Sequence, residues 1–346
     1  MVPEAVKDQF EQQAQSCERL GSPFTVRLCR LLPQVLTGET ETGRAVAGWT
    51  HGPDAALPLR LCGALHRLVL AEADADLAAA YPPEPAADAE LAAAVRAAIA
   101  AHDRSIAAML DSPPQTNEVA RAAGLLPGFL TVAREARLPL ELCEIGSSSG
   151  LLLGFDRFFY DYGAASWGDA ASAVRLQPEM HGDVPDLSGE LTVAARRGCD
   201  RSPIRLADPE ARLRLRGYVW ADQPQRLARL DAATEVSRAL DVSVEQADGT
   251  DFIQTALERR RDGTTLCVFH SIVWQYLPNE TQRTITDMME RAGREATADR
   301  PLAWLRMEPD GREPGAALLL QLWPGDGALR HLGRIDYHGR WLDWRG

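Results

Sequence analysis

The stretch at residues 144–150, E-I-G-S-S-S-G, constrains the fold of this chain more than any other part of the sequence. A mostly apolar run at residues 138–143 precedes it, and three leucines open a helix-like segment after it. This order predicts a strand, a glycine turn and a helix. Because glycine has no Cβ and tolerates positive φ, such a turn lets the backbone come close to a ligand. The N-terminus of the following helix is expected to present unpaired N–H groups.

The spacing of the acid and the glycines separates two classes of cofactor. A dinucleotide fingerprint would be G-x-G-x-x-G with its acid about 20 residues later, whereas Glu144 comes two residues before Gly146. The pattern resembles motif I of the class I S-adenosylmethionine-dependent methyltransferases, with Ser148 in place of the middle glycine. The resemblance implies that Glu144, Gly146, Ser147, Ser148 and Gly150 bind the cofactor, with the Glu144 carboxylate accepting hydrogen bonds from vicinal hydroxyls. A purely structural strand-to-helix turn is the alternative interpretation.

Two kinds of hydrophobic pattern divide the chain. Residues 1–135 are amphipathic or alanine-rich and predict helices, with breaks at proline pairs. From residue 136 to 346, short apolar runs alternate with helical stretches, which predicts βαβ units and a mostly parallel sheet. We therefore expect an α/β protein with a Rossmann-like, seven-stranded methyltransferase sheet and an N-terminal all-helical domain. A long insertion near 160–190 separates the first helix of the sheet domain from its second strand.

The expected elements follow from these patterns. Five strands are expected near 140–145, 191–196, 242–246, 265–270 and 302–307, followed by an antiparallel pair at 316–323 and 332–344. A helix is expected at 151–158 directly after the glycine turn. Residues 119–136 are expected to form two helices divided at Pro127-Gly128, because proline disrupts a helix interior.

Acids follow the second and third predicted strands. Asp200 stands where this fold typically holds the ribose hydroxyls, and Asp248 stands where an acid or amide lies beside the adenine amino group. Each has an equally simple structural explanation. Asp200 fits an ordinary aspartate turn or N-cap, and Asp248-Gly249 fits an Asp-Gly turn.

Polar and aromatic residues follow the fourth and fifth strands. In open α/β sheets ligands bind beyond the carboxyl ends of the strands, so His270 and Tyr276 are the catalytic candidates, and Trp274, Gln275 and Glu308 the candidates for substrate contact. His270 suits a general base, although a histidine in an apolar strand is more often a hydrogen-bonded core residue. Trp274 or Tyr276 offers a π face to a sulfonium charge, or walls the pocket.

Composition excludes several function classes. The formal net charge is −12 and the pI is near 5.1, which disfavours binding to nucleic acid because the phosphate backbone is repelled. The six cysteines form no C-x-x-C pair, so no metal site is expected. No signal-peptide core and no bilayer-spanning apolar run is present, so we expect a cytoplasmic location without membrane association.

The whole chain resembles a bacterial family of unknown function, domain-of-unknown-function family 2332. The resemblance rests on motifs at 114–118, 144–151, 198–200, 218–224, 268–276 and 304–309. It implies a methyltransferase-like domain behind a helical one. It also implies that Gln115 and Asn117 reach toward the cofactor and that Trp220 shapes the acceptor side.

These observations favour a methyltransferase that transfers the methyl group of S-adenosylmethionine to a small molecule. The alternative is a non-catalytic nucleoside-binding or regulatory protein that retains the fold, because Ser148 replaces a glycine and no acceptor motif is present. An NAD-linked oxidoreductase is disfavoured by the glycine spacing.

Overall fold

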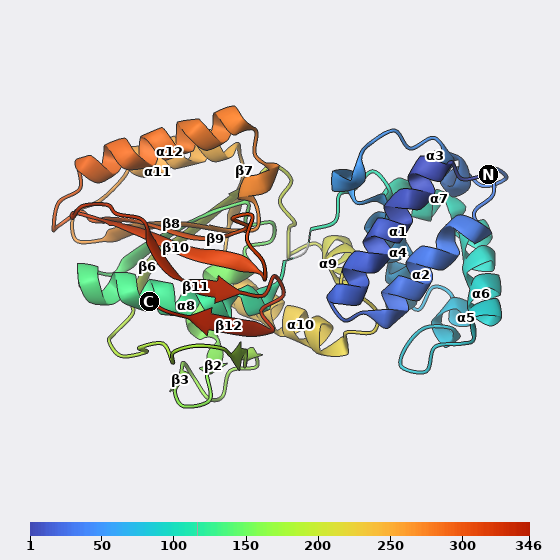
Figure 1. Ribbon diagram of the computed structural model, residues 1–346, viewed down its shortest axis with the longest axis horizontal. Helices are drawn as coiled ribbons and strands as arrows, with labels where there is room; N and C mark the ends of the chain where they lie inside the picture. The colour runs from blue at the N-terminus through green and yellow to red at the C-terminus, as the bar shows by residue number, and fades with distance from the viewer. Residues whose placement is uncertain (116) are drawn as a thin grey trace. The chain divides into compact units, whose positions relative to one another are not determined.

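The computed structural model of the protein describes residues 1–115 and 117–346. The chain forms two compact units (Figure 1). The helical unit comprises residues 1–115 with 206–228, and the sheet unit comprises 117–205 with 229–346. The expected boundary, between a helical domain at 1–135 and a sheet domain at 136–346, remains a prediction about which segments fold as independent domains. The protein is therefore a mixed α/β protein with an N-terminal helical region.

The helical unit is built from amphipathic helices around their own core. Helix α1 buries Val6, Phe10, Ala14 and Cys17 along one face, with the three-to-four-residue spacing of an apolar stripe. Ser22 is the N-cap residue of α2, but its hydroxyl donates to Asp222, whose other carboxylate oxygen accepts the Phe24 N–H. The helices of this unit are α1 (Glu4–Arg19), α2 (Pro23–Val35), α3 (Glu41–Ala47), α4 (Leu57–Leu70), α5 (Ala75–Ala79), α6 (Asp88–Ala101), α7 (Asp103–Met109) and α9 (Pro209–Gly217), with the 3-10 turn η1 (Pro53–Ala55).

The sheet unit contains a nine-stranded mixed sheet in the order β5-β12-β11-β10-β9-β8-β1-β6-β7. Its strands are β5 (Glu179–Met180), β12 (Trp341–Trp344), β11 (Arg330–Ile335), β10 (Ala316–Trp323), β9 (Leu302–Glu308), β8 (Thr265–Ser271), β1 (Leu140–Ile145), β6 (Val193–Asp200) and β7 (Val244–Gln246). The strands β7, β6, β1, β8 and β9 run parallel, and β9 to β12 form an antiparallel meander. The order reverses between β1 and β8, because the chain first moves to β6 and β7 on one side and then returns to β8 on the other.

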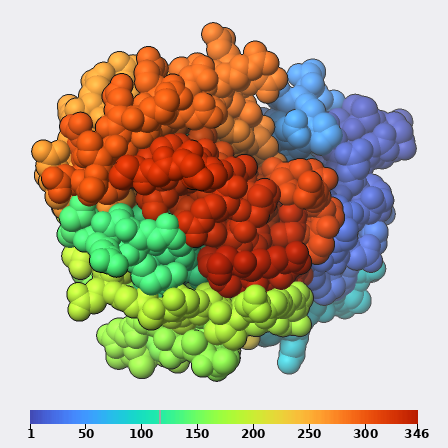
Figure 2. Space-filling model, turned by 60° about the vertical axis from the view of Figure 1, so that its left-hand side comes forward, coloured from blue at the N-terminus to red at the C-terminus, as the bar shows by residue number. Residues whose placement is uncertain are grey.

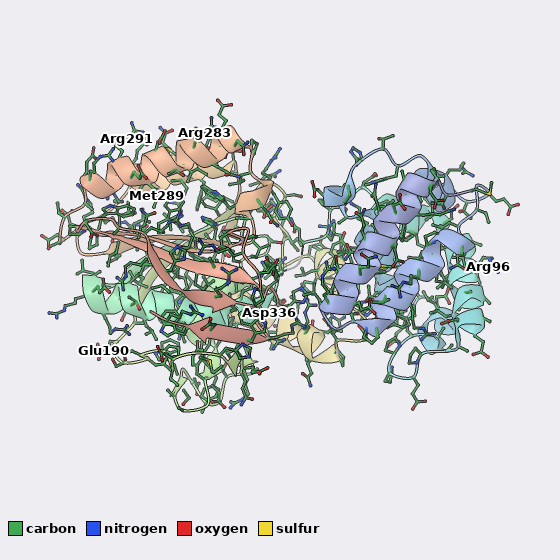
Figure 3. All side chains as sticks on the ribbon, in the orientation of Figure 1. Arg96, Glu190, Arg283, Met289, Arg291 and Asp336 are labelled. Carbon is green, nitrogen blue, oxygen red and sulfur yellow. The ribbon has the colours of Figure 1, made fainter. Side chains whose placement is uncertain are left out.

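Helices cover both faces of this sheet (Figure 1). Helices α11 (Gly249–Glu258) and α12 (Asn279–Arg294) pack on one face, and α8 (Ala122–Ala136) packs on the other. Figure 3 shows Met289 on the side of α12 toward the sheet, whereas Arg283 and Arg291 point away from it. Helix α10 (Pro224–Ala239) contributes residues to both units.

The structure corrects several expectations about this unit. The sheet has nine strands rather than seven, because residues 332–344 form parts of two strands and the insertion adds β5 beside β12. The rest of the insertion forms a small three-stranded sheet of β2 (Phe159–Asp161), β3 (Ser166–Trp167) and β4 (Arg175–Leu176). Figure 2 shows the yellow-green insertion along the red C-terminal strands. The expected helix at 151–158 is the 3-10 turn η3 (Leu151–Arg157).

Helix α8 also differs from its prediction, because it runs through Pro127-Gly128 without a break. Proline has no N–H, so the carbonyl of Ala123 loses its helical partner. The hydroxyl of Tyr162, from β2's hairpin, donates to this carbonyl at 2.7 Å. Gly128 lets the helix come close to β9, since a Cβ there would lie 2.6 Å from Leu305 Cδ1.

Candidate functional site

The carboxyl ends of the parallel strands bring four predicted site residues to one edge of the sheet. Glu144 lies in β1, Asp200 ends β6, His270 lies in β8 and Glu308 ends β9. Glu144 pairs with residues of both β6 and β8. This edge includes the reversal of strand order between β1 and β8, which is where open α/β sheets bind their ligands.

Glu144 is buried and carries an unsatisfied oxygen. Its side chain is 3% exposed, and Oε2 has no hydrogen-bond partner among the described residues. The pKa of this carboxyl is raised to about 8, chiefly by burial and to a lesser extent by the charge of Asp200, while a hydrogen bond from Ser147 and the charge of Arg121 act in the opposite direction. A buried acceptor without a donor is destabilising unless a ligand or water supplies one.

The bend after β1 needs the small residues that the sequence places there. Gly146, Ser148 and Gly150 have φ of +68°, +54° and +77°. A Cβ on Gly146 would lie 2.4 Å from Val273 Cγ2, so the loop after β8 packs directly on the bend. The glycines are thus required by close packing and by left-handed backbone.

Four N–H groups of the bend, those of residues 147–150, are bonded within the protein. The N–H groups of Ser147 and Gly150 donate to backbone carbonyls, at 3.0 and 2.8 Å. The N–H of Ser148 donates to Asp200 Oδ2 at 2.9 Å, and that of Ser149 donates to Asn117 Oδ1 at 3.2 Å. These four groups are therefore not available to a pyrophosphate, and η3 is a short 3-10 turn rather than the α-helix N-terminus that typically binds one. The geometry therefore argues against a dinucleotide bound here through its phosphates.

Asn117 is the side chain that ties the bend together. Its Nδ2 donates to Ser148 Oγ at 2.5 Å, and its Oδ1 accepts from Ser149 Oγ at 2.7 Å. The structure therefore places Asn117 beside the bend, where its side chain is hydrogen-bonded to residues of the bend itself. Gln115 and Trp220 belong to the helical unit, and Thr116 of the same motif lies outside the described residues.

A short polar segment beside Asn117 contains a residue that sequence reasoning missed. Arg121, in the 3-10 turn η2 (Val119–Arg121), is buried and donates to the backbone carbonyls of Ser271 and Tyr337. Its only signal in the sequence is that it is a charge in the otherwise apolar run 119–133. Glu118 is also buried and lies 3.9 Å from Arg229.

The two candidate acids for adenosine have structural partners. Asp200 Oδ2 accepts the Ser148 N–H, and its Oδ1 accepts the Ser202 N–H at 2.8 Å. Asp248 caps helix α11, because its Oδ1 accepts the Thr250 N–H at 2.9 Å. Asp248 remains exposed. Asp200 thus forms the aspartate turn that was its structural explanation, whereas Asp248 is an N-cap rather than part of an Asp-Gly turn. Each carboxylate oxygen retains a second lone pair.

His270 and Glu308 meet in the interior. The imidazole Nδ1 lies 2.6 Å from Glu308 Oε1, and the side chains are 0% and 5% exposed. Glu308 was expected to contact substrate, and the structure shows it bonded to His270 instead. Trp274 stacks on the imidazole at 4.9 Å, whereas Gln275 and Tyr276 point into solvent, Tyr276 with 63% exposure.

Left-handed backbone is concentrated at this edge of the sheet. Asn117, Ser148 and Ile272 have φ of +38°, +54° and +54°. For a β-branched residue such as Ile272 this conformation is strained. Strain of this kind persists where the surroundings enforce it, and it clusters at functional sites.

In residues 1–115 and 117–346, no group of three or more His, Cys, Asp or Glu side chains is arranged to hold a metal ion. Over the same ranges, no helix combines the length and the apolar character needed to cross a membrane.

Comparison with known proteins gives a family but no described relative. Neither the curated proteins nor the solved structures contain a match to this chain. Residues 7–344, nearly the whole chain, match the model of a bacterial family. The chain therefore belongs to the family described as "Uncharacterized protein conserved in bacteria (DUF2332)".

Proposed function

We propose that this protein is an S-adenosylmethionine-dependent methyltransferase that acts on a small molecule. The observation that carries the proposal is the buried, unpartnered Oε2 of Glu144, next to a close-packed glycine bend at the reversal of strand order. A ligand with hydroxyl donors would satisfy this oxygen. The parallel strands β7-β6-β1-β8-β9, with acids at the ends of β1 and β6, support a Rossmann-like arrangement.

The residues of the site fit this cofactor better than a dinucleotide. S-adenosylmethionine contains no phosphate, so it does not need the N–H groups that the bend uses internally. Its ribose has vicinal hydroxyls, which suit Glu144 and the remaining lone pairs of Asp200. When bound, it supplies an electrophilic methyl group on a sulfonium.

The protein's own task in such a reaction is alignment and exclusion of water. Methyl transfer needs the acceptor held in line with the methyl group, and a dry site prevents side reactions. The buried side chains of Glu144, Arg121 and His270 indicate that this edge of the sheet is poorly hydrated. No nucleophile of the protein is required, which explains why the sequence has no catalytic triad.

Calorimetry with S-adenosylhomocysteine tests the proposal. We expect the wild-type protein to bind it, and Glu144→Met to weaken binding at least about tenfold, because one buried hydrogen bond is worth about 1–3 kcal/mol when its partner is left unsatisfied. Glu141→Gln is the matched control: Glu141 is also a buried glutamate of β1, and alternation along the strand places it on the opposite face. Absence of binding to the folded wild-type protein at millimolar ligand would refute the proposal.

One observation favours a second candidate, a non-catalytic nucleoside-binding or regulatory protein. Asn117 bonds Ser148 and Ser149, and thus ties the bend to the protein itself. A bend that is held rigid in this way could bind a nucleoside even if the protein transfers no methyl group. Binding of S-adenosylhomocysteine without detectable methyl transfer to a broad panel of acceptors would favour this function.

A further inference from the structure

His270 and Glu308 form a buried pair on adjacent parallel strands. β8 and β9 are hydrogen-bonded neighbours, with His270 opposite Arg306, two residues before Glu308. The pair is held at 2.6 Å between Nδ1 and Oε1. Trp274 stacks on one face of the imidazole, and Trp304 lies 6.0 Å from it, so the ring orientation is fixed.

The hydrogen bonds around Glu308 identify which imidazole nitrogen carries the proton. Glu308 Oε1 also accepts the backbone N–H of Val273 at 3.1 Å. An ionised carboxylate oxygen can accept both hydrogen bonds and donates none, so next to the Glu308 carboxylate the shared proton sits on Nδ1. In the neutral ring Nε2 then keeps its lone pair. Nε2 is buried and has no hydrogen-bond partner within the described part of the chain.

We propose that His270 Nε2 is the proton acceptor of the site, that Glu308 is its positioning residue, and that the substrate is a proton-bearing nucleophile such as a phenol, another hydroxyl or an amine. This inference rests on the proposed function and adds the class of acceptor to it. The acceptor's O–H or N–H bond breaks as its heteroatom forms the new bond to carbon, and the proton moves to Nε2. Glu308 balances the imidazolium until the proton passes to solvent.

A groove on the α12 side lies against the tryptophan that covers the imidazole. Trp274, which covers His270, also lines an open groove of about 490 Å³. The other lining residues all belong to α12 and are polar: Asn279, Gln282, Arg283, Thr286 and Asp287. Trp274 belongs to the three-residue turn η4 (Trp274–Tyr276), and it is only half-buried.

Nitrogen-15 NMR of the histidines tests the pair without any assay of activity. In the wild-type protein we expect the neutral His270 ring to carry its proton on Nδ1. Glu308→Met, which removes the acceptor oxygen that glutamine would keep, should remove this fixed tautomer while the protein stays folded. His181 is the matched control, because it is also paired with a glutamate, Glu179, and stacked on a tryptophan, but at the surface. Glu179→Gln should leave the His270 signals unchanged. A proton on Nε2 in the wild-type protein would overturn the proposal.

Transfer assays then separate this inference from the proposed function. His270→Gln should lower methyl transfer to proton-bearing acceptors about 10²–10⁴-fold, the usual contribution of a general base, with unchanged binding of S-adenosylhomocysteine. His181→Gln should leave transfer unchanged. Normal transfer by His270→Gln would refute the base and leave the methyltransferase proposal standing. Failure of the wild-type protein to bind S-adenosylhomocysteine would remove both.

Discussion

Glu144 lies in the central strand β1, and burial raises the pKa of its carboxyl to about 8 from an ordinary value of 4.5. The native state therefore holds a proton that the unfolded state has released between these two pH values. By linkage, stability falls as pH rises from 4.5 to 8, because in this range the unfolded state binds fewer protons than the native state. Above pH 8 both states have released the proton, and stability levels off.

Replacing Glu144 with glutamine should remove this pH dependence. We expect the free energy of unfolding of Glu144→Gln to gain on the wild type by up to about 1.4 kcal/mol for each pH unit between 4.5 and 8. Chemical denaturation at pH 5.5, 7 and 8.5 measures the difference. Parallel stability curves for the two proteins would show that Glu144 is ionised in the folded protein at neutral pH.

Gly146 tests whether the bend is a close-packed contact. Gly146→Ala places a Cβ 2.4 Å from Val273 Cγ2 and keeps a φ of +68°, so we expect a loss of about 2–4 kcal/mol in unfolding free energy. Gly163→Ala is the control, because Gly163 has a φ of +81° but nothing within 4 Å of its Cβ position. It should lose only about 1 kcal/mol. Equal losses, measured by urea denaturation, would mean that Val273 does not pack on the bend.

At the scale of elements, the sequence predicted which strands and helices form better than it predicted where a helix is interrupted. All of the expected strands occur, although the last run divides between two strands, because apolar runs bounded by turns are local signals. The expected break at Pro127 is absent from α8, and the expected helix after the bend is the 3-10 turn η3. Both errors have a tertiary cause. Tyr162 satisfies the carbonyl that Pro127 leaves free, and this partner lies 39 residues from Ala123.

The Tyr162 contact predicts a coupling between two distant residues. Tyr162→Phe removes the donor to the buried Ala123 carbonyl and should cost about 1–3 kcal/mol. Pro127→Ala restores a helical N–H, so Tyr162→Phe should cost clearly less in that background. A double-mutant cycle by urea denaturation measures the difference. Additive effects of the two substitutions would contradict this account of the unbroken helix.

At the scale of the whole molecule, some segments join a sheet or a unit although no pattern in the sequence predicts where they will pack. The two-residue strand β5 joins the sheet edge beside β12, and residues 206–228 join the helical unit. The parallel orientation of β7, β6, β1, β8 and β9 follows from the alternation of strands and helices that the sequence predicts, whereas their order is known from the structure. Its consequence is that residues from four strands meet at one edge of the sheet.

The sequence alone determined the mixed α/β class, the strand before the bend, the small residues at the bend, and the edge of the sheet where polar side chains collect. These follow from hydrophobic periodicity and backbone preference, which depend on near neighbours along the chain. Only the tertiary structure decided that Asn117 and Asp200 occupy the bend's N–H groups, that Glu144 Oε2 is left without a donor, and that His270 pairs with Glu308. The partner of a buried polar group depends on which distant segments the fold brings together, and no local pattern encodes that.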